Sequence, residues 1–229
     1  MSDKRNLPAE VLARLTERGI NLADVNAETS RRGRTVESRV FTRPEIRMEM
    51  AEEDPDPIFE GYATIYDYPY DIAGGPEAGG WTEIIAPGAC AKSAGEADVR
   101  LLVNHEDLPL ARTKSGTLVL TSDDIGLKCY SKLDGDNPTV TEVRSCMERG
   151  DVDEMSFAFQ VLRQTWSPDY YTRTITEVKL FDVSIGTYPA NPAATAILTP
   201  TTDDIDVVRS GYPLSLALAE IERLALVRS

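Results

Sequence analysis

Two alternating stretches in the C-terminal half constrain the fold most strongly. Residues 154–162, "EMSFAFQVL", alternate between apolar and small or polar side chains, and residues 170–189 alternate again up to Pro189. Successive side chains of a strand point to opposite faces, so each stretch predicts a long β-strand. The core face of the first strand holds Met155, Phe157, Phe159 and Val161. Its other face then carries Ser156, Ala158 and Gln160.

Shorter strand patterns surround this pair. The segments "IFEGYATIY", "VRLLVNH", "GTLVL" and "IGLKCYSKL" are rich in β-branched and aromatic residues. The clearest helix is "NPTVTEVRSCMERG", where Asn137 is the expected N-cap and Gly150 the expected stop. A short helix is also predicted between Pro8 and Gly19. The pattern predicts an α+β fold that is mainly β.

The chain divides into three predicted parts. Residues 1–57 are expected to form a mobile, basic N-terminal arm with one short helix, because their apolar periodicity is weak. Residues 58–200 carry the strand patterns and form the predicted domain. Residues 201–229 form a tail whose end is an amphipathic helix, with apolar residues at helical spacing. That helix packs on the domain or binds a partner, and the sequence leaves both options open.

Composition excludes several classes of function. The net charge of −14 argues against nucleic acid as a partner, because phosphate binding needs a basic surface. Three scattered cysteines and one histidine fit neither a disulfide framework nor a zinc site. No apolar run approaches the roughly 20 residues that span a bilayer. We therefore expect an intracellular protein with no metal, cofactor or membrane partner.

His105 is the only histidine, and it ends the predicted strand "VRLLVNH". Histidine is the usual general base for nucleophilic catalysis near neutral pH. Ser156 lies on the face of its strand opposite the core side chains, and Asp182 lies on the matching face of the next long strand. If those strands are neighbours, the ring of His105 can reach between serine and acid. A surface histidine without catalytic function is the alternative.

Six segments between residues 58 and 192 resemble the prohead (capsid maturation) serine proteases of tailed bacteriophages. "RGDVDEMSFAF" is similar to the nucleophile motif, and "VNHEDLPLARTKSGTLVL" is similar to the histidine motif. "LFDVSIGTYPANPAAT" resembles the closing motif, where Asp182 stands at a position often held by Glu. The remaining matches are "GYATIYD", "IIAPGAC" and "DDIGLKCYSKL".

The resemblance implies a serine endopeptidase with a fold similar to the herpesvirus assemblin protease, a small closed or partly open β-barrel surrounded by helices. By motif, His105 is the general base and Ser156 the nucleophile. Asp182 is the expected third member, with Glu177 and then Asp107 as alternatives. Arg173 is a candidate oxyanion donor by analogy, and the Gly/Pro loop at 67–81 is expected to border the substrate cleft.

The implied partners are the major capsid protein precursor, its scaffold segment and the protease itself. The implied location is the host cytoplasm, inside the immature capsid (prohead). Self-cleavage sites and assembly contacts are expected within residues 1–50 and 201–229. Two alternatives remain: a catalytically silent scaffold or chaperone for capsid assembly, and a cysteine hydrolase with Cys90 as nucleophile.

Overall fold

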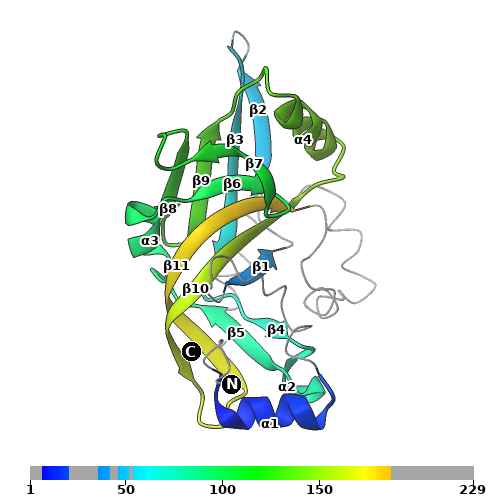
Figure 1. Cartoon of the computed structure of the whole chain (residues 1–229), viewed down its shortest axis with the longest axis vertical. Coiled ribbons are helices and arrows are strands. Elements are labelled where there is room, and N and C mark those ends of the chain that lie inside the picture. Colours follow the sequence, from blue (N-terminus) through cyan, green and yellow to red (C-terminus); the bar gives the residue numbers. More distant parts are fainter. Residues whose placement is uncertain (1–6, 21–35, 42–45, 52–53, 187–229) are drawn as a thin grey trace. The chain divides into compact units, whose positions relative to one another are not determined.

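The computed structural model describes residues 7–20, 36–41, 46–51 and 54–186. These residues form an α+β fold that is mainly β, as predicted (Figure 1). The helices are α1 (Ala9–Glu17), α2 (Gly75–Ala78), α3 (Ala91–Glu96) and α4 (Pro138–Glu148). The strands are β1 (Glu37–Phe41), β2 (Arg47–Ala51), β3 (Asp54–Ile65), β4 (Tyr70–Ile72), β5 (Trp81–Ile85), β6 (Arg100–Val103), β7 (Glu106–Arg112), β8 (Leu118–Ser122), β9 (Gly126–Lys132), β10 (Glu154–Trp166) and β11 (Thr172–Gly186).

The strands are arranged in two sheets. The seven-stranded sheet has the order β1-β10-β11-β5-β4, with β6 pairing with β11 and β7 pairing with β6. The four-stranded sheet has the order β2-β3-β9-β8. One core cluster joins them, because Phe59 and Leu127 of the second sheet pack with Phe157 and Ile185 of the first. Within the described residues the strands do not close into a barrel.

The long antiparallel hairpin of β10 and β11 is the predicted pair of alternating strands. Its register places Ser156 opposite Ser184 and Ala158 opposite Asp182, and the pairing shifts after Ala158 at a bulge or irregularity. The alternation predicts one core face, yet Ser156 and Ala158 are also almost fully buried. The reason is tertiary packing, because Ser38 of β1 and His105 contact Ser156 on the second face of β10.

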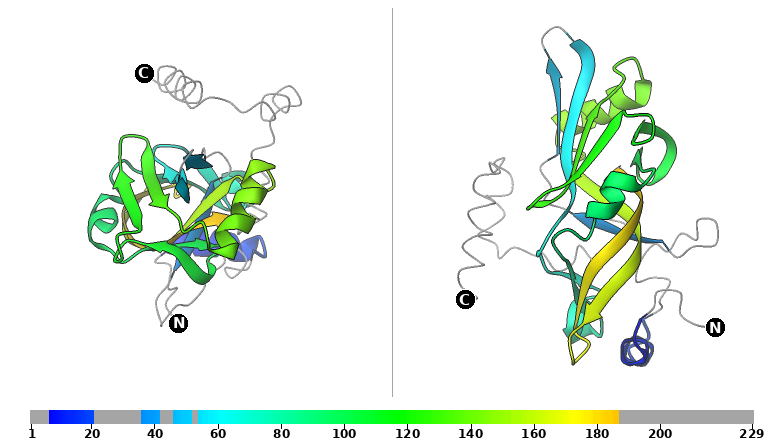
Figure 2. Two further views of the ribbon diagram at one scale, coloured as in Figure 1. Left: turned by 90° about the horizontal axis from the view of Figure 1, so that it is seen from above. Right: turned by 90° about the vertical axis from the view of Figure 1, so that its left-hand side faces the viewer.

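Helix α4 follows its sequence signals closely. The side chain of Asn137 accepts a hydrogen bond from the backbone N–H of Thr139, Pro138 occupies the first helical position, and Gly150 follows with a φ of 73°. Val140 and Val143 bury the apolar stripe of the helix. Figures 1 and 2 show α4 and α3 on opposite sides of the strands.

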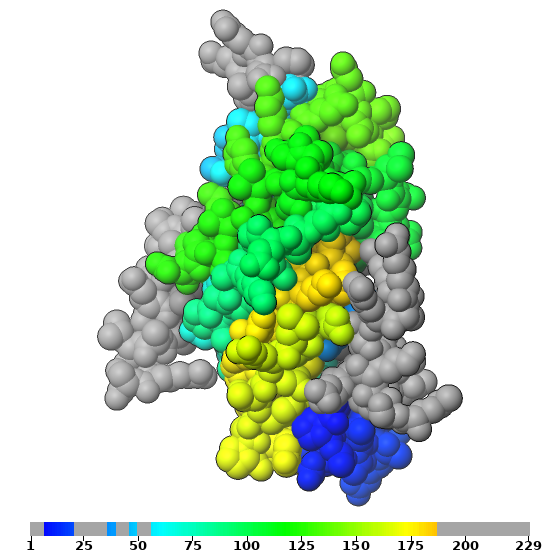
Figure 3. All heavy atoms as spheres, turned by 60° about the vertical axis from the view of Figure 1, so that its left-hand side comes forward, coloured from blue at the N-terminus to red at the C-terminus, as the bar shows by residue number. Residues whose placement is uncertain are grey.

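The N-terminal segment is paired with the rest of the protein at the residues described. β1 and β2 are antiparallel partners of β10 and β3, and α1 packs its Val11 and Leu15 against Ile72 and Trp81. Figure 3 shows α1 beside the turn of the β10–β11 hairpin. Ile58 therefore lies inside β3 rather than at the start of paired structure. The three-part division stays a prediction, and the tail at 201–229 lies outside the described residues.

None of the helices described here is long and apolar enough to cross a membrane.

Candidate active site

His105 is presented by a tight turn between two strands. Val103 and Glu106 pair across the turn, so Asn104 and His105 form a two-residue hairpin loop. Both residues have positive φ, 50° and 61°, which is the signature of a type I′ turn. The backbone N–H of His105 donates to Ser184 Oγ at 2.8 Å, and that of Asn104 donates to the Ile185 carbonyl at 3.0 Å. These bonds fasten the turn to β11.

Strand order brings the three predicted residues together. β11 lies between β10 and β6, so Asp182 stands between the strand of Ser156 and the strand that ends at His105. Ser156 Oγ lies 2.6 Å from His105 Nε2, and His105 Nδ1 lies 2.5 Å from Asp182 Oδ1. Asp182 is 1% exposed and the His105 side chain 18% exposed. A hydroxyl, an imidazole and a carboxylate linked in this order are the arrangement that activates a serine nucleophile.

The alternative third members lie elsewhere. Glu177 pairs with Arg163 at 3.0 Å and with Lys92 at 3.8 Å, and Asp107 is an exposed residue with a φ of 64°. The carboxylate bonded to the imidazole is that of Asp182. Cys90 is fully buried in the core cluster, and burial raises the pKa of its thiol to about 12. A buried, protonated thiol is a poor nucleophile, so the geometry does not favour the cysteine alternative.

Strand β1 covers Ser156. It pairs antiparallel with β10, and Val40 lies opposite Ser156 while Ser38 lies opposite Ala158. The hydroxyl of Ser38 is 3.0 Å from Ser156 Oγ and 2.8 Å from His105 Nε2. Ser156 Oγ also donates to the backbone carbonyl of Arg39 at 2.8 Å. Because a hydroxyl carries one proton, Ser156 donates either to this carbonyl or to His105.

A buried cluster of four charges lies beside these residues. It consists of Glu37 and Arg39 on β1, Glu83 on β5 and Arg173 on β11, each at most 3% exposed. Burial alone would raise the pKa of Glu37, but the charges of Arg173 and Arg39 outweigh it and lower the pKa to about 2. Burial likewise opposes the shift at Glu83, where Arg39 and Arg173 lower the pKa. All four groups are therefore charged at neutral pH. The guanidinium of Arg173, expected as an oxyanion donor, bonds Glu37, Glu83 and Gln164.

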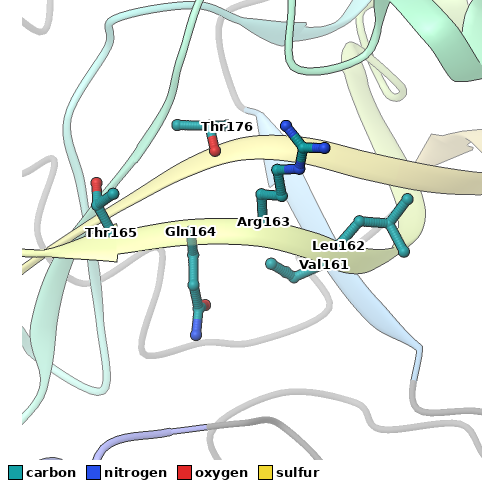
Figure 4. Close-up of a pocket in the computed structure, with 6 residues that line it drawn as sticks. All are labelled: Val161, Leu162, Arg163, Gln164, Thr165 and Thr176. Carbon is teal, nitrogen blue, oxygen red and sulfur yellow. The ribbon is translucent and has the colours of Figure 1, made fainter.

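A hollow of about 430 Å³ lies farther along the hairpin and is lined by residues 161–165 and Thr176 (Figure 4). Figure 4 shows Gln164 and Thr165 pointing to opposite sides of β10, as alternation requires. Gln164 Oε1 accepts a hydrogen bond from Arg173 Nε at 2.7 Å, which links this stretch of β10 to the charged cluster.

The part of the chain that carries the three linked residues matches a known family. The family model of the caudovirus prohead serine proteases matches residues 45–207. The chain belongs to this family. Strand β1 (Glu37–Phe41) lies before the matched residues.

Two known proteins are similar to this chain. The prohead protease of Enterobacteria phage HK97 is 26% identical over 157 residues, which cover 66% of this chain and 64% of that protein. The chain thus matches less than two thirds of the length of that curated relative. The capsid assembly protease of bacteriophage T4 is 12% identical in sequence, with a TM-score of 0.41 over 67% of this chain and 98% of that one.

Sequence reasoning missed the groups that surround the triad, namely Ser38, Arg39, Glu37 and Glu83. One signal for Glu83 was present: in "WTEII", residues 81–85, it shares a strand face with Trp81 and Ile85, and an acid on an apolar face marks a buried partner. β1 has no comparable signal. Within the described part of the chain, no cluster of metal-ligating side chains is found.

Proposed function

We propose that this chain is a serine endopeptidase of capsid maturation. Its proposed substrates are the major capsid protein precursor, the scaffold segment of that precursor, and the protease chain itself. Its proposed location is the immature capsid within the infected host cell. The observation that carries the proposal is the series of hydrogen bonds from Ser156 through His105 to Asp182, inside the region matched to the family.

The chemistry follows from this order of groups. His105 Nε2 takes the proton of Ser156 as Oγ attacks the scissile carbonyl carbon, and the same proton then goes to the leaving amine. The acyl-enzyme is hydrolysed by a water molecule that gives its proton to His105. Asp182 accepts a hydrogen bond from Nδ1–H of His105, holds the reactive tautomer and stabilises the imidazolium. The 2.5 Å bond and the buried position of Asp182 support this role.

Two finer expectations belong to the proposal. One is that residues 58–200 form the protease domain, with flanking segments that contain assembly contacts and self-cleavage sites. The other is that this unit shares its architecture with the herpesvirus assemblin protease. The two-sheet, mainly β arrangement supports the second expectation at the level of fold class.

The test replaces the nucleophile. Purified chain is incubated with its capsid precursor, and the products are read by intact mass. The Ser156→Ala change should lower cleavage roughly 10,000-fold or more, because the residues of a catalytic triad act as a unit. Ser115→Ala, an exposed serine on a turn, is the matched control and should cleave at the wild-type rate. Undiminished cleavage by Ser156→Ala would reject the proposal, and assembly without any cleavage would favour the scaffold alternative.

A further inference from the structure

β1 lies on the catalytic strand in the way an extended peptide adds to the edge of a sheet. It forms the end of the seven-stranded sheet and pairs residue by residue with β10, from Glu37 opposite Phe159 to Phe41 opposite Met155 (Figure 1). Strand addition of this kind is a common mode of peptide recognition, in which main-chain bonds give affinity and alternate side chains give specificity. Its edge position on β10, with its backbone against Ser156, makes β1 a candidate for a bound peptide segment.

The backbone of β1 places one peptide bond at the nucleophile. Ser156 Oγ lies 2.8 Å from the carbonyl oxygen of Arg39. A carbonyl bond is about 1.2 Å long, so the carbonyl carbon lies within about 4 Å of Oγ. This carbonyl belongs to the bond between Arg39 and Val40. The side chain of Ser38 points to the face of β1 opposite the side chain of Arg39, and it contacts the ring of His105.

The side chain of Arg39 occupies a buried acidic pocket. Its guanidinium bonds both carboxylate oxygens of Glu83, Nε to Oε1 at 2.6 Å and Nη2 to Oε2 at 3.1 Å. Tyr70 on β4 also donates to Glu83 Oε1 at 2.7 Å, and the guanidinium of Arg39 lies 5.5 Å from the ring centroid of Phe159. A planar, two-pronged donor opposite a carboxylate is the geometry that selects arginine over other side chains.

Glu37, two residues before Arg39, contacts a group of opposite charge, the guanidinium of Arg173. Glu37 accepts from Arg173 through both oxygens, at 2.8 and 3.1 Å. Residues i and i+2 of a strand share a face, which is why Glu37 and Arg39 enter the cluster together. β1 therefore brings one acid and one base to a body that presents one base and one acid. With β1 bound, the four charges of the cluster sum to zero. When β1 leaves, the remaining pair of Glu83 and Arg173 is also neutral.

We propose that Glu83 and Arg173 are the specificity-determining residues of this protease. They select substrates with glutamate two positions before an arginine, and the bond that follows the arginine is cleaved. This inference rests on the proposed function. β1 is then a self-cleavage segment: Ser156 Oγ bonds the Arg39 carbonyl carbon, the Arg39–Val40 C–N bond breaks, and His105 passes the serine proton to the Val40 amine. Water releases the Arg39 carboxylate from Ser156.

The same triplet pattern occurs twice more in the sequence, at residues 45–47 and at residues 142–144. Glu142, Val143 and Arg144 repeat it inside α4, and Val143 is buried there. A helix does not present its backbone as a strand, so this site should stay intact while the fold persists.

The test follows self-cleavage of the full-length chain by intact mass and N-terminal sequencing. Wild type should yield a new N-terminus at Val40. Glu83→Gln and Arg39→Ala should each slow this cut at least about 30-fold, because each leaves one partner of a buried charge pair unpaired. Arg39→Lys should recover part of the rate. Glu60→Gln is the matched control, since its carboxylate pairs with Arg47 and Lys128 on the other sheet, and it should cut at the wild-type rate.

A fluorophosphonate probe that labels active serines separates the two levels of the proposal. Labelling of Ser156 in wild type and in both slow variants, with cleavage lost, supports the pocket. In other outcomes, Ser156 is labelled while the cleavage rate is unchanged in Arg39→Ala and Glu83→Gln, or while the chain is cut at another bond. Either result overturns the proposed specificity pocket and leaves the protease assignment standing. Absence of both labelling and cleavage in wild type overturns the protease assignment and the pocket with it.

A peptide keeps the test independent of how the enzyme variants fold. The octapeptide TVESRVFT, residues 35–42, contains a single basic residue. Added to the Arg39→Ala chain, it should be cut between Arg and Val, and its counterpart with glutamate in place of that arginine should be cut at least about 30-fold more slowly. Equal cutting of both peptides, or of neither, would overturn the proposed specificity.

Discussion

His105 has a left-handed backbone conformation, which costs an ordinary L-residue about 1–2 kcal/mol. Three bonds hold it there: its N–H to Ser184, its Nδ1 to Asp182, and the adjacent Asn104 N–H to Ile185. All three partners lie on β11. Strain of this kind persists only where the surroundings over-determine the conformation. β11 therefore anchors the turn and supplies the acid, while Ser156 on β10 and Ser38 on β1 contact the other ring nitrogen.

The third member of the triad can be tested against its alternatives at this scale. Asp182→Asn should lower the cleavage rate about 10,000-fold, because an amide at this position favours the wrong histidine tautomer. Glu177→Gln, which breaks only surface pairs with Arg163 and Lys92, should leave the rate near wild type. Steady-state cleavage of a peptide substrate measures both. The assignment of Asp182 is wrong if the two variants lose activity equally.

At the scale of elements, the charged cluster fastens β1 to the body of the protein. Among the strands that the structure describes, β1 pairs only with β10, and its side chains at Glu37 and Arg39 are almost fully buried. Charges at such depth are tolerated because each one is paired. The docking of β1 thus depends on the ionisation of two carboxylates, one of which it contributes itself.

This dependence predicts a response to acid. The pKa of Glu37 falls from its ordinary 4.5 to about 2 in the folded protein. A depressed pKa means that the stabilisation is complete above about pH 4.5 and disappears as the pH falls toward 2. In a Ser156→Ala background, the free energy of unfolding by urea should drop through this window. Glu37→Gln should be less stable at pH 7 by about 2–3 kcal/mol and should change less with pH.

The matched control is Glu96→Gln, which removes an exposed carboxylate from α3. Its free energy of unfolding should equal that of the chain with the wild-type side chain at every pH. The prediction is wrong if Glu37→Gln loses as much unfolding free energy as the wild type between pH 4.5 and 2, because Glu37 would then not cause the acid response.

At the scale of the whole molecule, α1 gives the N-terminal segment a second attachment. A nine-residue helix is marginal on its own in water, so its docking stabilises it. Arg14 donates to the carbonyls of Gly79, Gly80 and Tyr170 at 2.8 to 3.1 Å, and its guanidinium lies 4.4 Å from the ring centroid of Tyr171. Helix α1 and strand β1 therefore both contact the rest of the described protein.

If the chain is cut after Arg39, residues 1–39 should stay bound to the remainder. Native mass spectrometry should find the two pieces together, and denaturation should separate them. Arg14→Ala should loosen the complex, because it removes three hydrogen bonds to the body, each worth roughly 1 kcal/mol or more. Free fragment from the wild-type protein immediately after cleavage would show that these contacts do not hold the segment.

Local patterns predicted much of this protein. The period of two over residues 154–162 and 170–189 led to β10 and β11, and the cap signals at Asn137 and Gly150 led to α4. The same alternation put Ser156 and Asp182 each on the non-core face of its strand. His105 was a candidate because it is the only histidine and ends a predicted strand. Each of these inferences needs only neighbouring residues, because strand alternation and helix capping are local effects.

The sequence by itself determined a mainly β protein. With the family resemblance, it also pointed to His105 and Ser156, and to Asp182 ahead of Glu177 and Asp107 as the acid of the proposed triad. The tertiary structure alone decided what lies against that triad. Ser38 and Ser156 are 118 positions apart, and the pairing of β1 with β10 leaves no periodic trace in either segment. A buried acid such as Glu83 is recognisable as unusual in sequence, but its partners come from distant strands. Strand pairing and charge pairing at long range depend on how the whole chain folds, so only the folded structure identifies them.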